Sequence, residues 1–142
     1  MNRKGFTLIE LIAVITIMSL IAIITTPAYD SISKSIKTRN YESKKNTIKA
    51  HTLSYVEKYL KNEAYNGTTS KILCFSVNYL IRNGIISSDN EKDEYIENNI
   101  TGEKYVNDEI FVKVQYNINK LKLVGYTLGD NDMPTTCDKN YK

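Results

Sequence analysis

A long apolar run near the N-terminus constrains this chain more than any other feature. The run extends from Phe6 to Ile24 and holds 19 residues, of which only four are polar: Thr7, Glu10, Thr16 and Ser19. An α-helix needs about 20 such residues to cross the hydrocarbon core of a membrane, so the run predicts a membrane-spanning helix. A carboxylate inside such a helix makes the free energy of membrane insertion less favourable by about 2.5–3.5 kcal/mol. Glu10 is therefore expected to have a function.

The charges before the run are compatible with two simpler interpretations, a secretory signal peptide and a plain membrane anchor. Arg3 and Lys4 favour a cytoplasmic N-terminus in either case. The run is longer than the about 7–15 apolar residues of a signal peptide, and no clean small-x-small cleavage site follows it. The nearest candidate, Thr26-Pro27-Ala28, has a proline at its centre. A retained helix is therefore favoured, and the plain anchor stays an alternative.

The residues at the start of the run resemble a known processing site. The sequence KGFTLIE, from Lys4 to Glu10, followed by a long apolar helix, resembles the site of type IV prepilins and of the pseudopilins of type II secretion and competence systems. The resemblance implies that a membrane aspartic peptidase, the prepilin peptidase, cuts after Gly5 and N-methylates Phe6. It also implies that Glu10 serves in filament assembly. Pro27 matches a proline that many members carry, and it is predicted to kink the helix.

The chemistry of Glu10 agrees with what the resemblance implies. A carboxylate buried in a filament core is unfavourable unless it meets a cation and hydrogen-bond donors. Cleavage after Gly5 would create an amine on Phe6, and the amine of a neighbouring subunit could supply both. Such a pair would specify axial register, whereas the apolar side chains around it would provide the free energy of association. The alternative is that Glu10 only extends to the lipid headgroups.

The second half of the helix is predicted from apolar residues at helical spacing, which continue to about Asn62. They are Tyr29, Ile32, Ile36, Ile48, Leu53, Val56 and Leu60. The segment from Lys34 to Lys49 is poorly apolar, which indicates either contacts between helices in a filament or a solvated helix. The chain is thus divided into a leader, residues 1–5, a membrane and assembly helix, residues 6–26, and a soluble head, residues 27–142, that includes the rest of the helix.

The head is predicted to be a short helix and a small antiparallel sheet packed on the C-terminal half of the long helix. Ser76 is expected to cap a helix that runs through Arg82, with Gly84 after it. A hairpin is expected from strands 110–116 and 121–126 with its turn at 117–120, and residues 104–106 are expected to add an edge strand. Residues 66–70, 87–93 and 100–103 are predicted loops or turns. The fold class is therefore α+β, pilin-like, and the Thr101-Gly102-Glu103 turn resembles Gram-positive members of the family.

The two cysteines, Cys74 and Cys137, are predicted to form a disulfide outside the membrane, with two free thiols as the alternative. The bond would close a loop of about 62 residues and contribute about 4 kcal/mol in the chain-entropy model. It would hold the C-terminal residues 129–142, which otherwise have little to attach them. Pilins often hold this region with a disulfide, but both of their cysteines usually lie late in the chain.

Composition and motifs give little support for catalysis, a cofactor or nucleic-acid binding. The formal net charge is +3, and loss of Arg3 and Lys4 leaves 17 cations against 16 acids, so no net basic field remains. His51 is the only histidine and is expected at the surface. No phosphate loop or metal-spaced His/Cys cluster is present. The oxygens of Asp130-Asn131-Asp132 suit Ca²⁺, but a solvated turn is the simpler interpretation, so no metal site is predicted.

The predicted function is structural rather than enzymatic. The chain is expected to be a subunit of a type IV pilus, serving adhesion, motility or DNA uptake. One alternative is a pseudopilin of a type II secretion or competence system, and a second is a membrane-tethered binding ectodomain that never assembles. The implied partners are other copies of the chain, prepilin peptidase, the inner-membrane assembly platform and, before assembly, membrane lipid. The precursor would cross the cytoplasmic membrane once, and the filament would reach the cell surface.

Overall fold

The computed structural model describes residues 6–92, 94–106 and 108–142, and the side chains of residues 24–28 lie outside this description. The chain divides into two compact units with a boundary between Thr38 and Arg39. The first contains the N-terminal part of a helix, and the second contains the rest of that helix and the head. Each unit is described by itself.

The long helix is confirmed. Helix α1 runs from Leu8 to Tyr55, and a π-helical turn, η1 (Val56–Leu60), joins it to α2 (Lys61–Ala64). The π turn was not predicted from the periodicity. A π turn holds more residues than an α turn, so the faces of the following residues rotate backwards. Val56, in the π turn, and Ala64, in α2, are both fully buried.

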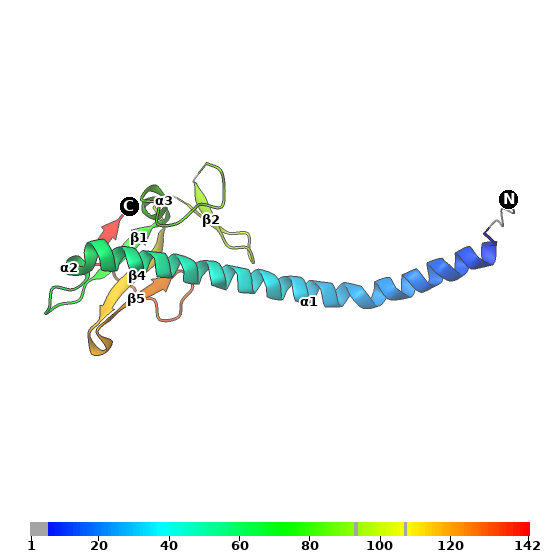
Figure 1. Ribbon diagram of the computed structural model, residues 1–142, viewed down its shortest axis with the longest axis horizontal. Coiled ribbons are helices and arrows are strands. Elements are labelled where there is room, and N and C mark those ends of the chain that lie inside the picture. Colours follow the sequence, from blue (N-terminus) through cyan, green and yellow to red (C-terminus); the bar gives the residue numbers. More distant parts are fainter. Residues whose placement is uncertain (1–5, 93, 107) are drawn as a thin grey trace. The chain divides into compact units, whose positions relative to one another are not determined.

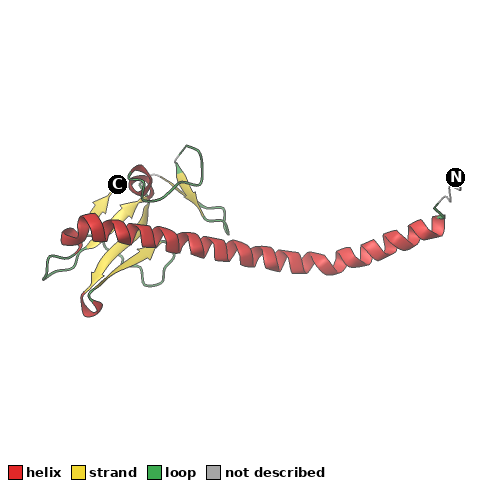
Figure 2. Ribbon diagram, in the orientation of Figure 1, coloured by secondary structure: helices red, strands yellow, loops and turns green. Residues whose placement is uncertain are grey.

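A four-stranded sheet forms the head, with strand order β5-β4-β1-β6. The predicted hairpin is confirmed as β4 (Ile110–Asn117) and β5 (Lys122–Thr127), joined by the 3₁₀ turn η2 (Ile118–Lys120). The Asn117 side chain accepts a hydrogen bond from the Lys120 amide, and Leu121 adopts a left-handed conformation with φ of 47°. In Figure 2 the C-terminal part of α1 crosses the face of this sheet.

Two strands of the sheet were not predicted. Strand β1 (Ile72–Ser76) pairs antiparallel with β4, and β6 (Lys139–Tyr141) pairs parallel with β1. The run at β1 is short and apolar and merges with the cap of the next helix, so periodicity does not separate the two elements. Strand β6 has no apolar alternation at all. The sheet therefore carries a parallel edge as well as antiparallel pairs (Figure 1).

The short helix α3 (Val77–Arg82) is confirmed with its cap, because the Ser76 hydroxyl accepts a hydrogen bond from the Tyr79 amide at 3.1 Å.

The strand predicted at residues 104–106 is present, but the prediction that it forms an edge of the main sheet is wrong. Strand β3 (Lys104–Val106) pairs with β2 (Tyr95–Glu97) in a separate two-stranded sheet. We call residues 89–109 the β2–β3 lobe; Asp93 and Asn107 lie outside the described residues.

The core of the head lies between the helix and the sheet. Its largest fully buried side chains include Phe75, Phe111, Leu73 and Leu80. The helix approaches β5 closely at Gly125, where an added Cβ atom would lie 2.7 Å from Cγ of Lys49. Packing of the sheet on the C-terminal part of the helix confirms the α+β, pilin-like architecture. It also shows that part of the poorly apolar segment, at Tyr41, Lys45 and Ile48, is covered by the head of the same chain.

Candidate functional site

The first candidate site is the N-terminal part of α1. Its large apolar side chains from Phe6 to Ile23 are 41–78% exposed, and Phe6 is the most exposed of them. Among the residues whose side chains are described, no helix is both long enough and apolar enough to cross a membrane. Gly5 lies outside the described residues. The helix continues through Pro27, but the side chain of Pro27 is outside the description, so the kink stays a prediction.

Glu10 is held by Thr7 at the first turn of this helix. Its Oε2 atom accepts hydrogen bonds from the Thr7 amide at 2.9 Å and from the Thr7 hydroxyl at 2.8 Å. The Glu10 amide donates in return to the Thr7 hydroxyl at 3.4 Å. This reciprocal arrangement is a capping box, which satisfies amides that a helix N-terminus otherwise leaves without partners. The pattern Thr-x-x-Glu before an apolar run is typical of such a box, but the box was not predicted from the sequence.

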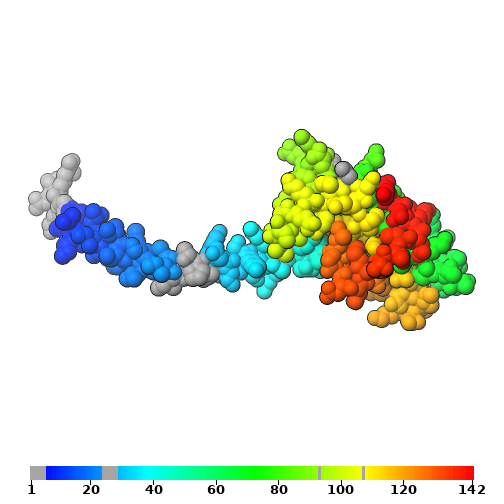
Figure 3. Space-filling model, turned by 180° about the vertical axis from the view of Figure 1, so that it is seen from behind, coloured from blue at the N-terminus to red at the C-terminus, as the bar shows by residue number. Residues whose placement is uncertain are grey.

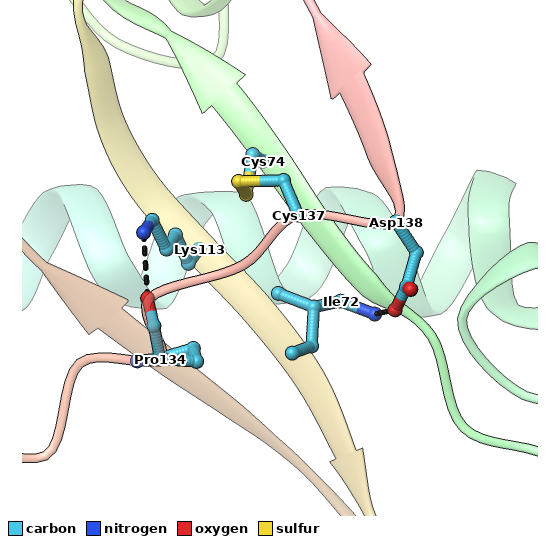
Figure 4. The surroundings of a disulfide bond; sticks show 6 residues. All are labelled: Ile72, Cys74, Lys113, Pro134, Cys137 and Asp138. Carbon is cyan, nitrogen blue, oxygen red and sulfur yellow. Dashed lines mark hydrogen bonds between the residues drawn. A yellow bond between two sulfur atoms is a disulfide. The ribbon is translucent and has the colours of Figure 1, made fainter.

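The second candidate site is the attachment of the C-terminal segment. Cys74 and Cys137 form a disulfide with 5.9 Å between their Cα atoms (Figure 4). Cys74 is fully buried in β1, so the bond joins the tail to the centre of the sheet. Lys113 of β4 also donates from Nζ to the Pro134 carbonyl at 2.6 Å. The tail thus has attachments on two neighbouring strands and forms part of the head surface (Figure 3, orange to red).

A carboxylate at the end of the long helix completes this attachment. Glu63 of α2 accepts hydrogen bonds from Lys139 Nζ at 2.7 Å and from the Tyr141 hydroxyl. The hydrogen bond from Lys139 and that from Tyr141 hold the pKa of Glu63 below its ordinary value. The Tyr141 ring stacks on Phe75 with 4.8 Å between centroids. Strand β6 is therefore held by a charged contact on one side and an aromatic contact on the other.

The groups around Asp130 are unlike those around a calcium ligand. Its Oδ2 atom accepts from the Thr127 amide at 2.8 Å and from Lys49 Nζ at 2.9 Å, and Lys45 Nζ lies 3.9 Å from Oδ1. Burial raises the pKa of Asp130, but the hydrogen bonds from Thr127 and Lys49 outweigh burial and lower it overall. Two ammonium groups at one carboxylate oppose binding of a further cation. We therefore propose no calcium site here.

Lys44 of the long helix attaches the β2–β3 lobe to that helix. Its Nζ atom donates to Asp89 Oδ2 at 2.8 Å and to the Glu97 carbonyl and Asn99 Oδ1, each at 3.0 Å. His51 lies one to two turns further on, at the surface, with Nδ1 3.2 Å from the Ile85 carbonyl oxygen. Among the described residues no cluster of three His, Cys, Asp or Glu is arranged to hold a metal ion.

Comparisons with known proteins agree with the N-terminal motif. Residues 1–26 match the family model described as the prokaryotic N-terminal methylation motif. The ComG operon protein 3 homolog of Bacillus licheniformis is 36% identical over 55 residues, which are 39% of this chain and 57% of that protein. The competence protein ComGC of Bacillus subtilis is 34% identical over 55 residues, 39% of this chain and 56% of that protein. The match thus spans little more than half the length of these relatives, and no solved structure matches.

The match of residues 1–26 covers the KGFTLIE sequence and the apolar run after it. The head adds an independent observation, because a long N-terminal helix with a small sheet packed on its C-terminal part is a pilin-like architecture. The chain thus carries the prokaryotic N-terminal methylation motif at residues 1–26 and has an α+β, pilin-like architecture.

Proposed function

We propose that this chain is a structural subunit of a filament of the type IV pilus class. In this proposal prepilin peptidase cuts the precursor after Gly5 and methylates Phe6, and subunits polymerise through their N-terminal helices. The precursor is a single-pass protein of the cytoplasmic membrane with its N-terminus in the cytoplasm. Its partners are membrane lipid, the assembly platform and then other copies of the chain. The protein has no enzymatic role.

The observation that carries the proposal is the state of the Glu10 carboxylate. Both hydrogen bonds from Thr7 end on Oε2, and among the described residues Oε1 has no donor. In this proposal the capping box orients the carboxylate, and Oε1 accepts a hydrogen bond from another subunit. The methylated amine of Phe6 on a neighbouring copy is such a donor, and it is also the cation that a buried carboxylate requires.

The apolar surface around Glu10 supports the same proposal. Apolar side chains on all sides of a helix are unfavourable in water and need lipid or other helices as neighbours. Before assembly the bilayer provides these neighbours, and in a filament the helices of other subunits replace it. Because every subunit presents the same helix, one interface repeats without closing, which gives a helical polymer.

Two finer functions fit this subunit. The sequence favours a subunit of a type IV pilus that serves adhesion, motility or DNA uptake, whereas the similarity to a competence protein of Bacillus subtilis supports the alternative, a pseudopilin of a competence system. Deletion of the encoding gene distinguishes these two functions. Loss of DNA uptake with unchanged adhesion and surface motility would assign the chain to competence, and the opposite result would assign it to a surface pilus.

The test of the proposal is the form of the chain in material sheared from cells. We expect a mass that begins at methylated Phe6 and an abundant chain in the sheared fraction. Substitution Glu10→Gln keeps the shape of the side chain and removes its charge, so processing should continue while filaments are lost. Glu57→Gln, at an exposed helical carboxylate, is the matched control and should assemble normally. An uncut chain found only in membranes would leave an anchored ectodomain instead.

A further inference from the structure

The charges of the head are strongly segregated. The β2–β3 lobe contains eight acidic and two basic residues, a formal net charge of −6. The rest of the unit from Arg39 to Lys142 contains thirteen basic and six acidic residues, a net charge of +7. The near-neutral balance of the whole chain therefore conceals an acidic lobe on a basic head. Complementary potentials of this kind guide association and select its orientation.

The tip of the lobe is a tightly held turn that presents one apolar side chain. Asn98 is buried, and its Oδ1 atom accepts hydrogen bonds from the amides of Ile100 at 3.0 Å and Thr101 at 3.4 Å. The Asn98 carbonyl accepts from the Gly102 amide at 2.7 Å, and the Asn98 amide donates to the Glu103 carbonyl at 2.8 Å. Ile100 remains 39% exposed. A turn held in this way loses little conformational entropy when it binds a partner.

Two carboxylates flank Ile100 in the sequence, Glu97 in β2 and Glu103 just before β3. Glu103 is exposed and Glu97 is partly exposed, and among the described residues neither forms an ion pair. Lys104 is the cross-strand partner of Glu97, but its Nζ atom lies over the Tyr95 ring, 4.4 Å from the centroid. The tip therefore combines an apolar side chain with two carboxylates that have no cation of their own chain.

A groove of opposite character lies between the helix and β5. It has a volume of about 380 Å³ and is lined by Leu53, Ser54, Glu57, Lys58, Lys122 and Leu123. Leu123 belongs to the core of the head, and Leu53 packs against that core. The base of the groove is therefore apolar, and its volume is sufficient for a branched aliphatic side chain.

The rim of this groove is basic. Lys58 lies in the π turn η1 and Lys122 begins β5, and both are exposed. Among the described residues neither lysine forms an ion pair, although Lys58 Nζ lies 5.0 Å from the centroid of the exposed Tyr59 ring. Glu57 is the one acidic residue of the lining, and Lys61 offsets its charge at 3.7 Å. The rim therefore offers two cations to an acidic partner.

The lobe and the groove belong to different sides of the head. Figure 1 shows β2 on one side and the turn that leads into β5 on another. The tip of a lobe therefore reaches a groove that belongs to another molecule. Two complementary patches at different places on one surface form a heterologous contact, which can repeat along an open polymer.

We propose that the lobe tip of one copy docks in this groove of a second copy, with Ile100 between Leu53 and Leu123. Glu97 and Glu103 then pair with the two lysines of the rim. A second copy fits the groove because its tip is acidic and apolar where the groove is basic and apolar. The inference rests on the proposed function, since a polymer brings the heads of different copies together. The contact involves residues of the heads alone.

The first experiment is a charge exchange in the full-length chain, measured as the amount of chain in the sheared fraction. The groove variant Lys58→Glu/Lys122→Glu should reduce filaments by about tenfold, because like charges then meet at the interface. The tip variant Glu97→Lys/Glu103→Lys should do the same, and the four substitutions together should restore the yield. Wild-type yields for the groove variant or the tip variant, or failure of the combined variant to recover, would overturn the docking.

Two sets of variants distinguish loss of this contact from loss of the fold or a change of net charge. Lys71→Glu/Lys142→Glu reverses as many charges at exposed lysines outside the groove and should leave filaments unchanged. Ile100→Ser should reduce filaments, whereas Ile100→Leu keeps an aliphatic side chain and should assemble normally. Equal yields for the two Ile100 variants, or equal losses for both pairs of reversed lysines, would contradict the docking.

The second experiment uses a water-soluble carbodiimide on sheared wild-type filaments. The reagent activates a carboxylate of the tip, a lysine amine of the groove attacks it, and an amide forms as the reagent leaves as a urea. We expect a ladder of linked chains and, by mass spectrometry, peptides that join Glu97 or Glu103 to Lys58 or Lys122. The variant Lys58→Arg/Lys122→Arg keeps both charges and cannot form these amides, so the peptides should disappear while filaments remain.

The outcomes also separate this inference from the proposed function and from binding of a polyanion in the groove. Normal filaments without the linked peptides would overturn the inference and leave the proposed function intact. If the groove variant forms normal filaments that no longer retain a fluorescent double-stranded DNA bound by wild-type filaments, the groove holds a polyanion and the docking is wrong. A wild-type chain that never enters sheared material would overturn both proposals.

Discussion

Asp138 and Ile72 are joined by two hydrogen bonds that fix the register of the C-terminal strand. The Asp138 amide donates to the Ile72 carbonyl at 2.9 Å, and Asp138 Oδ2 accepts from the Ile72 amide at 2.7 Å (Figure 4). One residue of the tail thus satisfies both backbone groups of the first residue of β1. Because β6 contains only three residues, this contact and the disulfide beside it determine where the strand starts.

Asp138→Ala is expected to reduce the free energy of unfolding by about 1 kcal/mol, since the Ile72 amide loses its acceptor at a site that water partly reaches. Urea unfolding of the purified chain measures the change. Asp132→Ala removes an exposed carboxylate of the same segment and is the matched control. Equal stability of the two variants would show that the tail does not depend on this contact.

Removal of the disulfide should destabilise the head by about 4 kcal/mol in the chain-entropy model, because the bond restricts a long loop of the unfolded chain. The bond closes a sequence separation of 63 residues. The measurement is thermal unfolding of the wild type with and without a dithiol reductant. The double variant Cys74→Ser/Cys137→Ser should unfold at the lower temperature and should not respond to the reductant. A response of that variant would assign the effect to something other than this bond.

Gly125→Ala should destabilise the packing of the helix on β5. The new methyl group would lie 2.7 Å from Lys49 Cγ and 3.2 Å from Leu53 Cγ, so both side chains must move. Movement of Lys49 also lengthens its ion pair with Asp130, which is 2.9 Å long. We expect a loss of about 1–3 kcal/mol, the usual effect of overpacking, measured by urea unfolding.

A double-mutant cycle distinguishes this clash from a general effect of alanine in a strand. Lys49→Ala removes the nearest atom, so Gly125→Ala should cost less in that background than in the wild type. Additive effects of the two substitutions would contradict the proposed clash.

Acid should weaken the attachment of β6 through Glu63. The hydrogen bond from Lys139 lowers the pKa of Glu63 in the folded chain below the ordinary value of 4.5. A lowered carboxylate pKa stabilises the fold above the unfolded-state pKa, and this contribution is lost as the pH falls through the folded-state pKa. Stability should therefore decline below about pH 4.5. Glu63→Gln should be less stable than the wild type at pH 7 and should lose less on acidification, as measured by thermal unfolding across this range.

Sequence alone determined the elements whose signals are local. The apolar run from Phe6 and the KGFTLIE motif predicted the long helix and the family. The Ser76 cap and the turn after Asn117 predicted a helix and a hairpin that the structure confirms. Capping, turn chemistry and helical periodicity act between residues a few positions apart, so a single chain shows them directly. The Thr7–Glu10 capping box belonged to this class and was missed although its spacing was visible.

The tertiary structure decided what depends on distant residues. Strand β6 exists because Cys137 reaches Cys74, Asp138 reaches Ile72 and Lys139 reaches Glu63, contacts that join positions more than sixty residues apart. The π turn at Val56–Leu60, which contains the fully buried Val56, was likewise not predicted from the periodicity. Such features follow from burial and pairing across the fold, which local propensity does not encode.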